Sequence, residues 1–247
     1  MVTSPEITLS LAGLEAGAGS AWSGGVREAV AWAAGLGYRR VQLDARVLRA
    51  RELSRSARRD VGAMLRRHGL VCTGMDAWIP TAHIASGAHT ERAVAAVAGA
   101  CELAGELAGL TGGPRGVVCV VLPEDVSPAV EGTLVDAAER AGVVLADHAW
   151  PVRKGSRLAV GVDPAEMLRG GVDPSAALAG LTPAPSTARL TDWSEAGRVT
   201  VGHGRLRVAE YVAVLMTVGM TGPLVVDVRG VRDQADAAAV ALRRFAG

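Results

Sequence analysis

The sequence predicts an α/β protein in which eight parallel strands close into a (β/α)8 barrel, the TIM barrel fold. Short apolar runs alternate with segments of helical periodicity along the whole chain. Glycine stands at several helix-to-strand junctions, where a left-handed residue commonly ends a helix. The length of 247 residues suits one barrel. We therefore expect a single domain over residues 1–247, with a doubly wound open sheet as the alternative.

The expected strands are short apolar runs, as is typical of parallel sheets that are buried on both faces. They cover residues 7–11, 40–43, 70–75, 116–122, 143–147, 157–162, 187–191 and 223–228. The expected helices cover residues 26–36, 52–68, 90–110, 128–141, 164–169 with 175–181, 208–218 and 233–245. Asp163-Pro164 and Asp173-Pro174 each favour a helix start, with Asp at the N-cap and Pro at the first helical position.

One connection is too short for a helix. Only residues 148–156, with Pro151 and Gly155, join the fifth and sixth strands. A parallel crossover normally needs about a dozen residues, and nine extended residues span roughly 30 Å. We predict that the fifth barrel helix is missing. A homo-oligomer or a partner subunit would then cover strands five and six; alternatively, neighbouring helices or the loop at Trp150 fold over the gap.

Composition excludes several classes of partner. The formal net charge is +1, which gives no electrostatic reason to expect nucleic acid or an anionic membrane. No uninterrupted apolar run reaches the roughly 18 residues of a membrane span. The three cysteines, Cys72, Cys101 and Cys119, are scattered through apolar segments, which favours packed thiols in a reducing compartment. We expect a cytoplasmic protein.

Function in α/β barrels lies where strands end and the following loops begin. Polar and aromatic side chains mark these positions, and periodicity alone does not rank them. They are Asp44, Arg46, Asp76, Trp78, Glu124, Asp125, Asp147, His148, Trp150, Asp163, Glu166, Arg189, Asp192, Trp193, Asp227 and Arg229.

The last third of the chain carries a recognisable order of motifs. Asp163-Pro164 ends one apolar strand, residues 188–192 (Ala-Arg-Leu-Thr-Asp) end the next, and Val225-Val226-Asp227-Val228 forms a third, with Gly202-His203-Gly204 between the last two. This order resembles the xylose isomerase-like TIM barrels of the sugar phosphate isomerase/epimerase superfamily. The resemblance covers most of the chain and is strongest over residues 139–227.

The resemblance implies four metal-ligand positions at strand ends, and this chain departs from the family at several of them. The first ligand, a Glu in the family, falls at His148 or, in another register, at Asp147. The Asp ligand falls at Asp163, the His ligand at Arg189 and the last Glu at Asp227. Arg keeps its proton and repels a cation. The remaining metal set is His148, Asp163 and Asp227, for a divalent ion such as Mn, Mg, Co or Zn, and the alternative is no cofactor.

The same residues suggest chemistry without a metal. Isomerisation and epimerisation remove a proton beside a carbonyl, and a guanidinium in a dry site stabilises the resulting oxyanion. Arg189 is the candidate for that role, with His148 and Asp227 as bases on opposite sides of the substrate carbon. The alternatives are purely structural roles: Asp163 is only an N-cap, and Arg189 forms a structural ion pair with Asp163 or Asp227.

The remaining candidates would bind substrate. Trp78, Trp150 and Trp193 fall near strand ends and would form an apolar wall against a sugar ring. Glu166 stands where the family commonly has a further His, and Asp192 follows the seventh strand; we expect both to contact the substrate.

The resemblance implies a sugar isomerase or epimerase acting on a small sugar-like substrate. A lyase or dehydratase on the same scaffold is one alternative, because both begin with proton abstraction. The other is a barrel that has lost catalysis and serves as a binding or partner subunit.

Overall fold

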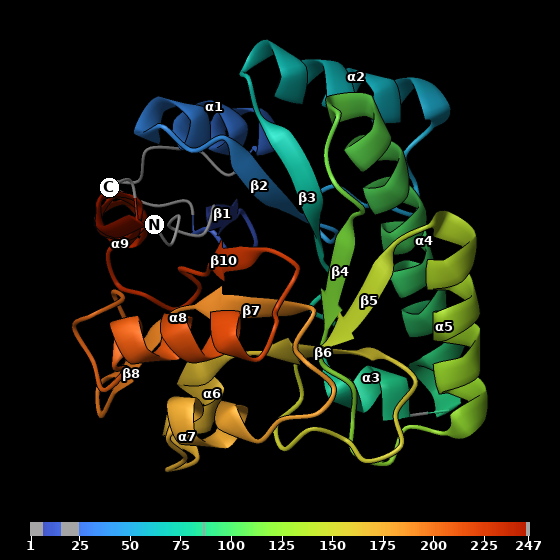
Figure 1. Ribbon diagram of the computed structural model, residues 1–247. Helices are drawn as coiled ribbons and strands as arrows, with labels where there is room; N and C mark the ends of the chain where they lie inside the picture. The colour runs from blue at the N-terminus through green and yellow to red at the C-terminus, as the bar shows by residue number, and fades with distance from the viewer. Residues whose placement is uncertain (1–6, 16–24, 86, 246–247) are drawn as a thin grey trace.

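A computed structural model of the chain describes residues 7–15, 25–85 and 87–245. Eight parallel strands form a closed barrel in the order β1-β10-β7-β6-β5-β4-β3-β2 (Figure 1). They are β1 (Ile7–Ser10), β2 (Arg40–Asp44), β3 (Val71–Asp76), β4 (Val117–Val120), β5 (Val144–Asp147), β6 (Ala159–Val162), β7 (Thr187–Leu190) and β10 (Leu224–Val226). The predicted barrel is confirmed, and the open sheet is wrong. The predicted domain of residues 1–247 includes ends that lie outside the described residues.

Helices surround the barrel. They are α1 (Val26–Leu36), α2 (Arg55–Arg67), α3 (Thr81–Ala85), α4 (Gly87–Thr111), α5 (Pro128–Ala141), α6 (Pro164–Arg169), α7 (Pro174–Ala179), α8 (Val208–Thr217) and α9 (Gln234–Phe245). Asp163 and Asp173 cap α6 and α7 as predicted, and each accepts a hydrogen bond from a backbone N–H of the first turn. In this role Asp163 brings its second carboxylate oxygen to the mouth of the barrel.

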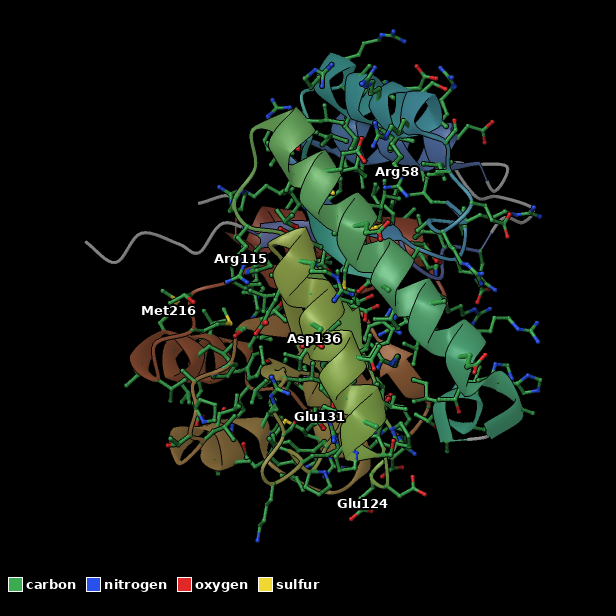
Figure 2. All side chains as sticks on the ribbon, turned by 90° about the vertical axis from the view of Figure 1, so that its right-hand side faces the viewer. Arg58, Arg115, Glu124, Glu131, Asp136 and Met216 are labelled. Carbon is green, nitrogen blue, oxygen red and sulfur yellow. The ribbon has the colours of Figure 1, made fainter. Side chains whose placement is uncertain are left out.

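Helix α4 is long and apolar enough to cross a membrane by length and composition alone. Its most apolar 18-residue window has a mean hydropathy of 1.5, and half of that window is buried inside the barrel fold. Figure 2 shows α4 running beside α5 along one side of the molecule. Burial against neighbouring elements accounts for its apolar residues, as in other helices that cover a barrel.

No helix lies between β5 and β6, as predicted. Residues 148–158, here called the strap, make the crossover instead. Arg153 anchors the strap through hydrogen bonds of 2.8 Å to Asp147 Oδ2 and 2.9 Å to Glu131 Oε2. Glu131 also accepts a hydrogen bond of 3.0 Å from Ser156. It lies near the start of α5, where Figure 2 labels it. The strap is therefore held to the end of β5 and to a neighbouring helix by buried charges.

A cavity of about 440 Å³ remains where the helix is missing. Residues of the strap, Leu158 to Val160, and residues 180–183 line it. The strap covers this side of the sheet only in part. The homo-oligomer or partner subunit over strands five and six stays a prediction.

Candidate active site

A large cavity lies at the carboxyl ends of the strands and has a volume of about 980 Å³. Strand ends, α6, the strap and a hairpin supply its side chains. The hairpin consists of β8 (Asp192–Ser194) and β9 (Gly197–Val199), an antiparallel pair that follows β7. Of the predicted site residues, Trp78, His148, Trp150, Asp163 and Glu166 line this cavity, together with Arg198 and Arg229. The cavity therefore lies at the strand ends where the sequence placed the candidate site, and the roles of these residues stay predictions.

Guanidinium groups engage the carboxylates of this site. Arg229 Nε lies 2.9 and 3.0 Å from the two oxygens of Asp227. Arg198 Nη2 lies 2.5 Å from Asp163 Oδ2 and 3.1 Å from Glu166 Oε1. Arg198 Nη1 faces Asp227 Oδ2 at 3.7 Å. These contacts tie the ends of β6 and β10 to the hairpin.

Arg189 lies deeper, inside the barrel. Its side chain is fully buried and forms an ion pair with the fully buried Asp76. Arg189 Nη1 also donates to Gln42 Oε1 at 3.2 Å, and Arg189 Nε lies 4.0 Å from Asp227 Oδ2. Strands β7 and β3 lie four places apart in the eight-strand order, so this side chain crosses the barrel interior. The sequence predicted an ion pair to Asp163 or Asp227, but the main partner is Asp76.

The charge of Asp227 follows from its neighbours. Burial raises the pKa of this carboxyl group. The charge and hydrogen bonds of Arg229, and then the charges of Arg189 and Arg198, lower the pKa by more than burial raises it. The net pKa lies well below the usual range for Asp. Asp227 is thus a carboxylate engaged by arginines, and its predicted role as a general base stays a prediction.

The predicted metal set does not fit the arrangement of these side chains. Among the described residues, no three His, Cys, Asp or Glu side chains converge in a way that could hold a metal ion. Asp163 and Asp227 instead share guanidinium partners. A divalent cation would have to displace at least two arginines, each of which repels it. The carboxylates of Asp163 and Asp227 are therefore arranged to bind arginine side chains and not a metal ion.

His148 is the one cavity-lining imidazole among the described residues. It directly follows β5 and is 3 % exposed. Its backbone N–H donates to Val120 O at 2.8 Å. Neither ring nitrogen has a partner in good hydrogen-bond geometry within the described residues, but the backbone of Val162 lies near enough to the ring to raise its pKa slightly. Its ring packs against Gly161 of β6, at a place that a β-carbon on residue 161 would occupy. Burial lowers the pKa of His148 well below its usual value, and the charges of Arg189 and Arg229 lower it further. The imidazole is therefore neutral.

The three tryptophans have different surroundings. Trp78 lies 4.0 Å from Arg229 Cζ and 5.0 Å from Arg189 Cζ, measured to its ring centroid, so it supports guanidinium groups through cation–π contacts. Trp150 lines the cavity from the strap. Trp193 lies in the hairpin, packs against the main core and does not line the cavity. The predicted wall of three rings is not assembled there.

Asp192 organises a loop. It is fully buried and accepts hydrogen bonds from the backbone N–H groups of Gly202 at 3.0 Å, Gly204 at 2.9 Å and Leu206 at 2.8 Å. Trp193 N donates to it as well, at 2.8 Å. Its oxygens are occupied by backbone donors, so the structure gives the Gly202-His203-Gly204 motif a folding role and leaves Asp192 away from the cavity.

Sequence reasoning missed three members of the arginine–carboxylate cluster. Asp76 and Arg229 stood among the strand-end residues, but the resemblance gave them no role. Arg198 had no signal, because two three-residue strands are too short to show periodicity. The Gly202-His203-Gly204 motif, which follows Asp192 by ten to twelve residues, was the available hint of a compact turn.

Comparisons with known proteins support the fold. No protein-family model and no curated protein matches the chain. Solved structures do match: a xylose isomerase domain protein from Planctomyces limnophilus is 18% identical, with a TM-score of 0.73, covering 100% of this chain and 97% of that one. A xylose isomerase-like TIM barrel protein from Mycobacterium smegmatis, solved in complex with magnesium, is 14% identical with a TM-score of 0.73, covering 99% and 97%.

A third similar structure is a D-psicose 3-epimerase solved in the presence of D-fructose. It is 16% identical with a TM-score of 0.69, covering 97% of this chain and 98% of that one. The chain thus has the fold of the xylose isomerase-like TIM barrels, and the resemblance inferred from the sequence is confirmed at that level. At such identities the likeness establishes the fold and leaves the activity to the site residues.

Proposed function

We propose that this barrel is an isomerase or epimerase of sugar-like substrates that abstracts a proton beside a carbonyl without a metal ion. The observation that carries the proposal is His148, a neutral imidazole that lines a large cavity beside Arg198 and Arg229 and forms no side-chain hydrogen bond within the described residues. A base and cationic hydrogen-bond donors are the two components that this chemistry needs.

The proposed reaction uses these residues in fixed roles. His148 takes the proton from the carbon beside the carbonyl, and the C–H electron pair becomes the C=C bond of an enediolate. The negative charge moves to the former carbonyl oxygen, where Arg198 or Arg229 stabilises it. The neighbouring arginines disfavour the imidazolium, so His148 readily gives up the proton. Its return to the adjacent carbon on the same face, with transfer of the hydroxyl proton from one enediolate oxygen to the other, gives the isomer. For epimerisation, a water molecule in the cavity supplies a proton to the opposite face of the original carbon, and the hydroxide that remains takes the proton held by His148.

The roles expected from the sequence shift accordingly. Arg189 is buried behind Trp78 and does not line the cavity, so the stabilising role passes to Arg198 and Arg229. Asp227 becomes a positioning residue that holds Arg229. Glu166, through Arg198, and Trp150, in the strap, remain candidates for shaping the substrate site.

Solvent exchange tests the proposal. The chelator-treated protein is incubated in D₂O with aldoses, ketoses and 2-keto sugar acids, and deuterium incorporation is followed by NMR and mass spectrometry. We expect exchange beside the carbonyl of one substrate class, and a fall of at least about 100-fold in the His148→Gln variant. Exchange that requires an added divalent metal, or that persists in His148→Gln, contradicts the proposal.

A second candidate function is a binding barrel without catalysis. The engagement of Asp163, Glu166 and Asp227 by arginines favours it, because these carboxylates then offer no free base. Binding of sugar-like ligands without any exchange in the same assay would support this alternative. A lyase or dehydratase would release water or a fragment after the same exchange step, which the mass spectra separate.

A further inference from the structure

Buried hydrogen-bond donors without partners gather at one end of the large cavity. Trp78 Nε1 and Arg198 Nη1 are buried and form no hydrogen bond within the described residues, although Arg198 Nη1 lies 3.7 Å from Asp227 Oδ2. The neutral ring of His148 beside them offers one N–H donor and one acceptor nitrogen. All three side chains line the cavity. A buried donor left without an acceptor costs free energy, which a ligand that supplies an acceptor recovers.

The acceptors of this end are already in use. Asp163 and Glu166 accept from Arg198, and Asp227 accepts from Arg229. A ligand hydroxyl would bring its own O–H donor, and these carboxylates already accept from arginines, so the acceptor nitrogen of His148 could receive only one such donor. An anionic oxygen accepts hydrogen bonds and brings no donor, so it matches the indole N–H and the guanidinium groups.

The local charge favours an anion as well. Arg189 and Arg229 approach the Trp78 ring together, and their charges outweigh that of Asp227 at His148. Arg229 is fixed between Asp227 and the ring, so its guanidinium group is held in place before a ligand arrives.

We propose that this end of the cavity, formed by Trp78, His148, Arg198 and Arg229, binds an anionic oxygen group of the ligand, so that the substrate is an acidic sugar derivative and not a neutral sugar. A carboxylate and a phosphate share this chemistry. The proposal rests on the proposed function only for the sugar-like body of the ligand.

Three probes of matched carbon chain test it: D-glucitol, D-gluconate and D-glucitol 6-phosphate. They lack a carbonyl, so isothermal titration calorimetry measures binding without turnover. We expect gluconate or glucitol 6-phosphate to bind at least about tenfold more tightly than glucitol. The stronger of the two identifies carboxylate or phosphate as the group bound.

Two variants locate the anion. Trp78→Phe keeps an aromatic ring and removes the N–H, and Arg198→Gln removes the charge; we expect each to lower the anion preference by about tenfold or more. Arg243→Gln, which removes an exposed charge on α9, should leave it unchanged. Circular dichroism and thermal unfolding confirm that each variant is folded.

Equal affinity for all three probes, no binding of either acid at millimolar concentration, or an anion preference that survives both variants overturns the inference. The proposed function fails separately, because its test is solvent exchange. Exchange with neutral sugars alone would support the proton-abstraction chemistry and contradict the anion site.

Discussion

At the scale of single residues, the site depends on close packing around one imidazole. The absence of a side chain at Gly161 lets the His148 ring lie against β6, where it faces the cavity. The sequence named His148 as a candidate base from its place at a strand end. It gave no indication that Gly161, two residues before Asp163-Pro164, makes room for that ring.

The first prediction concerns Gly161. Replacement by Ala places a methyl group where the His148 ring lies, so the ring must move away from its position beside the arginines. We expect Gly161→Ala to reduce solvent exchange by at least about tenfold and stability by about 1–3 kcal/mol, as for other overpacked sites.

The matched control is Gly109→Ala in α4, where an added β-carbon meets nothing within 4 Å. It should leave exchange unchanged and stabilise the protein by roughly 0.4–1 kcal/mol, because alanine restricts the unfolded chain. Equal exchange rates in Gly161→Ala and the parent protein would remove the positioning role of Gly161.

At the scale of elements, the strap makes the crossover between β5 and β6 without a helix, and an arginine between two carboxylates holds it in place. Arg153 lies between Asp147 and Glu131, all with side chains at most 11% exposed. The short spacing between the strands indicated the missing helix. It did not indicate how the crossover is held, because the partners come from the end of β5 and from α5.

We expect Arg153→Gln to leave two nearly buried carboxylates without their cation and to destabilise the fold by about 3 kcal/mol. Urea unfolding measures this change. Arg169→Gln is the control, since its ion pair with Glu166 is mostly exposed and should contribute at most about 0.5 kcal/mol. Similar losses in both variants would show that the strap does not depend on Arg153.

At the scale of the whole molecule, the arginine–carboxylate cluster joins strands from across the barrel. Arg189 reaches from β7 to the end of β3, while Arg198 and Arg229 join the hairpin and β10 to the end of β6. The barrel and its strand ends followed from the alternation of apolar runs. Which charged side chains pair did not, because partners such as Asp76 and Arg189 lie 113 residues apart and meet only after the barrel closes.

Asp227 links this cluster to the pH dependence of stability. Its pKa is lowered in the folded state, so its contribution is complete above the unfolded pKa of about 3.9 and is lost as the pH falls below that value. We expect Asp227→Asn to cost roughly 3–5 kcal/mol at pH 7, and the difference from the parent protein to shrink as the pH falls below about 4.

Urea unfolding at a series of pH values checks this, with Asp236→Asn as an exposed control expected to change stability by less than about 0.5 kcal/mol. A constant difference between Asp227→Asn and the parent protein across the acid range would mean that the Asp227 carboxylate is not stabilised by its arginines.

The most direct measurement of the central claim, that guanidinium groups stand where the resemblance implies a metal, is anomalous X-ray diffraction from crystals grown with manganese chloride. We expect no manganese peak between Asp163 and Asp227, with Arg198 and Arg229 bound to these carboxylates as described here. A peak coordinated by both carboxylates and His148, with the arginines turned away, would contradict the claim.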